Sequence, residues 1–212
     1  MCDLRPNLAM RLYVSCGLTH VPRHEFDEYA RLIHAIARSC EENGAEVRYA
    51  LRDSDPQLAV KPTSERARLC YLWDREMVEW ADAVVADATY PSIGVGIELQ
   101  IAEQRGMPIV LCYRRSAVNQ AAVVEYENPD RSQHSLQIGE GYVSLMALGV
   151  PTIFRVVGYT SSEDALRSVV DAVATLQIVA LSWMREGHLT WRWPRALGKY
   201  LCTSAQAARA SP

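Results

Sequence analysis

The sequence predicts an α/β fold in which a five-stranded parallel sheet is covered by helices on both faces. Short apolar runs with the composition of strands alternate along the chain with longer segments of helical periodicity. The run AVVA at 83–86 has no polar face, which is typical of a strand that is buried from both sides. Strands separated by helices of this length are expected to pair in parallel through right-handed crossovers.

The first part of the chain provides two strand-and-helix pairs. Residues 11–16 (RLYVSC) form a predicted strand that ends at Gly17, and residues 25–43 have apolar side chains at helical spacing. Residues 46–51 (EVRYAL) alternate as a second strand, and residues 63–80 are periodic enough for a second helix.

The second part continues the same alternation. The remaining predicted elements are a third strand at 83–86, a helix that follows the glycine-rich turn within 91–106, a fourth strand at 107–113, a fifth strand at 152–157 and a helix at 162–181. This order predicts a doubly wound sheet of the flavodoxin-like or Rossmann-like class.

Two regions interrupt the alternation. Residues 114–142 are polar, contain Pro129 and have no clear period, so we interpret them as an insertion after strand four or a lid on a domain spanning 1–181. Residues 182–212 form an extension that places three tryptophans among arginines before a tail expected to be disordered. Its aromatic residues could pack on the domain or a partner subunit, or contact a membrane or nucleic acid. We favour packing because few basic residues accompany them.

Composition limits the class of protein and of partner. The 212 residues carry a net charge of −3 without a basic stripe, which argues against nucleic-acid binding and favours a small-molecule partner. No apolar run approaches a membrane span and the N-terminus lacks a secretory signal, so we expect a cytoplasmic protein. The six cysteines include no C-x-x-C pair, so we expect reduced thiols.

Ligands of open parallel sheets bind at the carboxyl ends of the strands, where helix N-termini also meet. This rule selects CGLTH at 16–20, the loop after Tyr113, and DATYPSIGVGIE at 87–98. In the last stretch Gly94 and Gly96 allow close approach of a ligand to the backbone, and Ser92 provides a hydroxyl. The glycines match neither the P-loop nor the dinucleotide fingerprint, and a sugar phosphate would suit the site.

Two carboxylates are the candidate reactive groups. Glu98 falls in the first turn of the helix after the glycine-rich turn, where it could be an ordinary helix-start carboxylate stabilised by the macrodipole. Asp74 lies on the preceding predicted helix and could approach the same strand ends. Two carboxyls at one site, one attacking an anomeric carbon and the other handling protons, are what double-displacement cleavage of a glycosidic bond requires.

The segment from Asp74 to Leu99, which contains ADAVVADATYPSIGVGIEL, resembles the signature of the nucleoside 2-deoxyribosyltransferase superfamily. It is most similar to the branch of 2′-deoxynucleoside 5′-phosphate N-hydrolases, whose motif runs ADVVVAExTxPSxGVGxEL. The resemblance implies that Glu98 is the nucleophile that forms a glycosyl-enzyme intermediate and that Asp74 is the acid/base carboxylate. It also implies phosphate contacts at Ser92 and Gly94, while Asp87 stands where these hydrolases have Glu.

The N-terminal part of the resemblance is less regular. LYVSCG resembles the family's LYFCGS, in which the tyrosine lies at the active site; aligning Cys16 and Gly17 displaces Tyr13 by one residue. The family's phosphate-binding SIRGG corresponds to LTHVP at 18–22, so Thr19, His20 or Arg23 would replace its serine and arginine. His20 and His24 are spaced for a metal but lack a third ligand, so we expect no metal.

VSLMALG at 143–149 resembles the hydrolases' LSAMIRG, in which the serine reaches the phosphate of the neighbouring subunit. The resemblance therefore implies a homodimer in which Ser144 crosses the interface and Met146 lies beside it. It spans roughly residues 11–178, and residues 114–142 are an insertion relative to it.

The expected function is hydrolysis of the N-glycosidic bond of a ribo- or 2′-deoxynucleoside 5′-monophosphate, without metal or organic cofactor. One alternative is a deoxyribosyltransferase that exchanges bases between nucleosides. Another is a nucleotide-binding sensor that keeps the fold without turnover.

Overall fold

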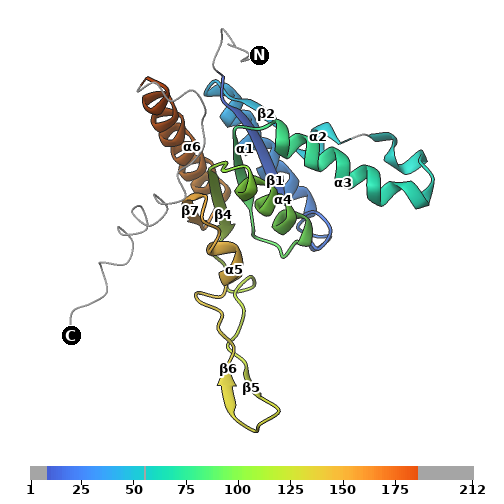
Figure 1. The fold of residues 1–212 in the computed structure, drawn as a ribbon, viewed down its shortest axis with the longest axis vertical. Coiled ribbons are helices and arrows are strands. Elements are labelled where there is room, and N and C mark those ends of the chain that lie inside the picture. The colour runs from blue at the N-terminus through green and yellow to red at the C-terminus, as the bar shows by residue number, and fades with distance from the viewer. Residues whose placement is uncertain (1–8, 55, 186–212) are drawn as a thin grey trace.

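A computed structural model describes residues 9–54 and 56–185. Its central sheet has the strand order β2-β1-β3-β4-β7, and every neighbouring pair is parallel. The five strands are β1 (Arg11–Cys16), β2 (Glu46–Arg48), β3 (Ala83–Asp87), β4 (Ile109–Arg114) and β7 (Ile153–Tyr159). The predicted five-stranded parallel sheet is confirmed, and Figure 1 shows the helices arranged around it.

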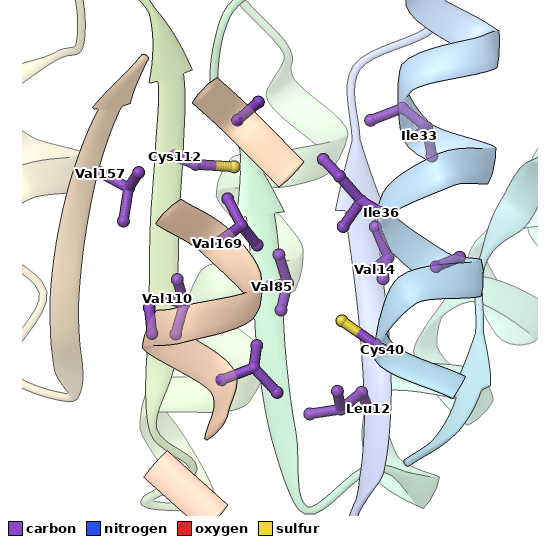
Figure 2. Close-up of a cluster of buried hydrophobic side chains, with 14 of the residues drawn as sticks. Leu12, Val14, Ile33, Ile36, Cys40, Val85, Val110, Cys112, Val157 and Val169 are labelled. Atoms are coloured by element: carbon purple, nitrogen blue, oxygen red, sulfur yellow. The ribbon is translucent and has the colours of Figure 1, made fainter. Parts of the chain in front are cut away.

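Helices cover both faces of the sheet. One face packs against α1 (Phe26–Glu42) and α6 (Ser162–Arg185), and Figure 2 shows this core, in which strand and helix side chains interlock. The other face packs against α3 (Thr63–Trp80) and α4 (Ile93–Gln104). Because side chains alternate along a strand, Leu12 and Val14 enter the first core while Tyr13 enters the second.

The second strand is shorter than predicted. It pairs with β1 only as far as Arg48, and the chain then forms the helical turn α2 (Ala50–Asp53), followed by a 3-10 helix (Pro56–Val60). The Asp53 carboxylate accepts the backbone amide of Tyr49 at 2.9 Å. This local side-chain bond favours the turn over continued pairing, and alternation of residue types could not reveal it.

The last strand is longer than the predicted 152–157. It continues to Tyr159 and pairs with β4 through Arg114. At Gly158 a Cβ atom would collide with Nε of Arg115. Glycine at this position therefore leaves room for the Arg115 side chain, and it does not end the strand.

Helix α6 extends to Arg185, four residues beyond the predicted end at 181. Its segment Ser162–Ser182 is long and apolar enough to cross a membrane by length and composition, which the sequence reading did not recognise. Buried alanines, valines and a leucine of α6 pack on the sheet together with α1, so one face of this helix belongs to the core. The remaining part of the predicted extension, 186–212, lies outside the described residues, including Trp191, Trp193 and the expected disordered tail.

The insertion at 114–142 is not entirely irregular. It contains an antiparallel hairpin of β5 (Glu125–Glu127) and β6 (Gln133–Ser135), which extends away from the sheet in Figure 1. A short helix, α5 (Leu145–Leu148), connects it to β7. The hairpin's strands have three residues each and all six side chains are exposed, so they carry no apolar alternation that would predict them.

Candidate active site

Glu98 lies in the second turn of α4 rather than in the predicted first turn, because the helix already begins at Ile93. Its side chain is anchored by strand β1. Its carboxyl group is buried, with the residue only 8% exposed. The Tyr13 hydroxyl donates to Oε1 at 3.0 Å, and the Ser15 hydroxyl donates to Oε2 through a short hydrogen bond. Tyr13 and Ser15 are two residues apart on β1 and therefore point to the same face of the sheet, toward α4.

This environment raises the pKa of Glu98 from its ordinary value of 4.5 to about 7. Burial is the largest cause, because a charged carboxylate loses its hydration there. The hydrogen bonds from Ser15 and Tyr13 act in the opposite direction, and the negative charge of Asp74 raises the pKa further. Glu98 is therefore a carboxyl group that exchanges its proton near neutral pH.

Asp74 acts on the same site from α3. Its side chain is half-buried, burial raises its pKa, and the thiol of Cys70 donates to Oδ2 at 3.5 Å. The charge of Asp74 contributes to the raised pKa values of both Glu98 and Tyr13, which places the three groups within electrostatic reach of one another. The fold thus brings together the three residues that the sequence nominated for catalysis.

The loops after β1 and β3 are packed against each other. A Cβ atom at Gly17 would lie 2.8 Å from Cβ of Ser92 and 3.2 Å from the carbonyl oxygen of Tyr90. A larger residue at 17 would therefore push the two loops apart. The close packing of the two loops therefore requires glycine at position 17.

Ser92 begins α4. Its hydroxyl accepts the amide of Val95 at 3.2 Å as an N-cap, so it already has a structural function. Gly94 and Gly96 follow in the first turn, both exposed, and a Cβ atom at Gly96 would meet nothing within 4 Å. Packing within the chain thus does not require glycine at 96, and the space beside it is open.

The other predicted phosphate-binding residues lie on two exposed segments of the chain. Thr19, His20 and Arg23 are exposed on the loop after β1. Ser144 is exposed and caps α5 by accepting the amide of Met146 at 3.3 Å, while Met146 is 86% exposed. The hydrogen bonds of the described chain join none of these five side chains to Glu98, Tyr13 or Asp74.

A cavity of about 350 Å³ lies beside α3, but neither Glu98 nor Asp74 lines it. It is lined by Arg48, Asp53, Trp73, Glu76 and Met77. Over residues 9–54 and 56–185, no group of three or more histidine, cysteine or acidic side chains is placed to hold a metal ion.

Two features of the site escaped the sequence reading. Ser15 contacts Glu98, and its position two residues after Tyr13 on a predicted strand is a signal that could have identified it. Asp87, noted only as a departure from the hydrolase motif, accepts hydrogen bonds from Tyr29, Thr89 and Tyr159 under the loop that leads to Ser92. The partners come from distant parts of the chain, so no local pattern indicated them.

Comparison with known proteins identifies relatives. No family model matches the chain. A protein of Methanosarcina mazei named "Putative 2′-deoxynucleoside 5′-phosphate N-hydrolase 1" is 30% identical over 142 residues, which cover 66% of this chain and 73% of the relative. A protein of the same name from Syntrophotalea carbinolica is 37% identical over 59 residues, covering 28% of this chain and 42% of the relative.

Two solved structures share part of the architecture. A conserved protein of Enterococcus faecalis has a TM-score of 0.48 and 19% identity, covering 76% of this chain and 97% of its own. The CMP N-glycosidase BcmB of Clostridium botulinum has a TM-score of 0.45 and 16% identity, covering 75% and 97%. At these scores neither structure bears on the function of this chain.

The M. mazei relative is 30% identical and is aligned over more than two thirds of its length. The chain belongs to the family of 2′-deoxynucleoside 5′-phosphate N-hydrolases.

Proposed function

We propose that this protein is a hydrolase that cleaves the N-glycosidic bond of a nucleoside 5′-monophosphate, releasing the base and a sugar 5-phosphate. The observation that carries the proposal is the buried carboxyl of Glu98, held by the Tyr13 and Ser15 hydroxyls beside Asp74. The names of the relatives, which describe N-hydrolases of 2′-deoxynucleoside 5′-phosphates, support it.

In the first step the Glu98 carboxylate attacks C1′ of the sugar. A C1′–O bond to Glu98 forms while the C1′–N bond breaks, and its electron pair leaves with the base, which takes a proton from Asp74 and leaves Asp74 as a carboxylate. The raised pKa of Asp74 suits it to hold that proton before transfer. The Tyr13 and Ser15 hydroxyls hold the carboxylate of Glu98 in one orientation, so that its attacking oxygen always faces the same direction.

In the second step water replaces the enzyme at C1′. The Asp74 carboxylate takes a proton from water, the water oxygen bonds to C1′, and the C1′–O bond to Glu98 breaks with its electron pair returning to the carboxylate. The step consumes one water and regenerates both carboxyl groups, so the cycle requires no metal or organic cofactor.

The phosphate end of the substrate would lie at the N-terminus of α4. Ser92 and Gly94 are there, and the amides of a first helical turn favour an anion. Thr19, His20 and Arg23 lie on the loop after β1, and Gly17 packs that loop against Ser92. A cationic side chain from this exposed loop would take the place of the arginine found in similar hydrolases.

We further infer a homodimer in which Ser144 and Met146 of one copy approach the site of the other. Several apolar side chains on α4 and α5 are exposed and would be covered by a second copy. They are Ile93, Ile97, Leu145 and Met146, with exposed fractions of 83%, 43%, 46% and 86%. A cytoplasmic location is consistent with the free thiols of Cys16, Cys40, Cys70 and Cys112.

The test is base release, followed by chromatography, from a panel of ribo- and 2′-deoxynucleoside 5′-monophosphates and the corresponding nucleosides. We expect release from a monophosphate and its loss by a factor of about 10³ or more in Glu98→Ala. Glu46→Gln, which changes an exposed carboxylate on β2, is the matched control and should retain activity.

The same panel separates the alternatives. Release that requires an added acceptor base would identify a transferase. Nucleotide binding without release from any substrate, even with acceptor bases present, would contradict both enzymes and favour a sensor.

A further inference from the structure

Asp87 is a buried carboxylate whose oxygens are fully occupied by donors. It ends β3 and is 1% exposed. The Tyr29 hydroxyl and the Thr89 amide both donate to Oδ1 at 3.0 Å, while the Tyr159 hydroxyl and the Cys112 thiol donate to Oδ2 at 2.7 and 3.6 Å. These donors come from α1, the following loop, β7 and β4, so one side chain joins four parts of the fold.

The loop that follows Asp87 is held along its length. The Thr89 hydroxyl shares a hydrogen bond with Tyr159 at 2.9 Å and accepts the Arg114 amide at 2.9 Å, while the Thr89 carbonyl accepts from Asn119 at 3.1 Å. The Tyr90 hydroxyl donates to Glu25 at 2.7 Å. Two residues later Ser92 begins α4, so these bonds determine where the first turn of that helix lies.

This network is separate from the one that holds Glu98. Asp87 alternates with Val85 and lies on the face covered by α1 and α6, whereas Tyr13 and Ser15 point to the face covered by α3 and α4. No hydrogen bond among the described residues joins Asp87 to Tyr13, Ser15 or Glu98. The two ends of the candidate site therefore rest on different supports.

We propose that Asp87, together with Tyr159, is a positioning residue that sets the phosphate-binding end of the site through segment 88–92, while Glu98 is set independently by β1. The inference rests on the proposed function for its kinetic consequence. The structural part of the inference, that the Asp87 network holds the β3–α4 loop in one conformation, does not depend on the proposed function.

Tyr159→Phe is the most informative variant. It keeps a fully buried ring and removes the hydroxyl that contacts both Asp87 and Thr89. Tyr29→Phe removes a single contact to Asp87 and should have a smaller effect. Tyr49→Phe is the control, because it removes the hydroxyl of another buried tyrosine, which is bonded to His34 and has no hydrogen bond to this network.

Two measurements are made on each variant. The first is KM and kcat for a 2′-deoxynucleoside 5′-monophosphate and for the same nucleoside without phosphate. The second is hydrogen exchange of amides 88–96. We expect Tyr159→Phe to raise KM for the monophosphate about tenfold, the effect of losing one or two hydrogen bonds, with kcat and the nucleoside's KM within twofold. Exchange over 88–96 should be faster than in wild type and in Tyr49→Phe.

A purely structural role would give a different pattern. If Tyr159→Phe behaved like Tyr49→Phe, or if it impaired both substrates equally, the positioning role would be refuted. If wild type released no base at all, the proposed function would fail on its own terms. Exchange would then decide the inference, because unchanged protection of 88–96 in Tyr159→Phe would refute it and faster exchange would support it.

Discussion

Glu98 and Asp87 are both buried carboxyl groups near the carboxyl ends of the central strands, but their surroundings differ. Asp87 accepts from four donors, one of them a backbone amide, so hydrogen bonds replace the water that it lost on folding. Glu98 accepts from two hydroxyls, and burial outweighs them, raising its pKa to about 7. The comparison teaches that the supply of donors, more than burial itself, separates a carboxylate that holds the fold from one available for chemistry.

The two carboxyl groups should differ most in how their replacement by an amide changes the free energy of unfolding. Asp87→Asn cannot accept from all four donors, and an unsatisfied buried donor costs about 1–3 kcal/mol. We therefore expect the free energy of unfolding to fall by about 2–4 kcal/mol, measured by urea denaturation at pH 8.

Glu98→Gln should change the free energy of unfolding in the opposite direction at pH 8. The folded-state pKa of Glu98 is about 7 against an ordinary 4.5, so its contribution to stability is present below pH 4.5 and is lost as pH rises through about 7. The neutral glutamine avoids this loss, and the variant should be more stable than wild type by roughly 3 kcal/mol at pH 8. Equal destabilisation by the two amide variants would remove the distinction drawn between the two carboxyls.

The ionisation of Glu98 should also control how the rate depends on pH. A nucleophilic Glu98 must be ionised while Asp74 holds the proton for the base, so kcat/KM should follow a bell-shaped pH profile with one limb near the pKa of Glu98, about 7. The profile is measured by base release from pH 5 to 9, with stability checked at each pH. A profile with no limb near pH 7 would contradict a nucleophile with a raised pKa.

The smallest effect is expected when one of the hydroxyls that bind the Glu98 carboxyl group is removed. Ser15→Ala removes a hydrogen bond that lowers the pKa of Glu98, so the limb of the profile near pH 7 should move to higher pH by roughly one unit. Tyr29→Phe, which removes a buried hydroxyl from the Asp87 network, is the matched control and should leave the midpoint unchanged. If both variants moved the midpoint equally, the two networks could not be independent.

Local sequence was sufficient for most of the sheet. Apolar strands and helical periodicity predicted the five strands and the helices between them, and motif resemblance nominated Glu98, Asp74 and Tyr13, which the fold brings together. It was insufficient at 49–53, where the Asp53 bond to the Tyr49 amide ends β2. It also failed within 114–142, where the hairpin side chains are exposed and carry no periodic signal.

The sequence by itself determined the order of strands and helices, because burial of a strand or of one helix face imposes a period on residue type. Only the tertiary structure decided that Ser15 contacts Glu98 and that Asp87 gathers Tyr29, Cys112 and Tyr159. Those contacts join positions 25 to 83 residues apart along the chain. The physical reason is that hydrogen bonds depend on the positions of two atoms in space, and these are fixed only when the sheet has brought its strands into register.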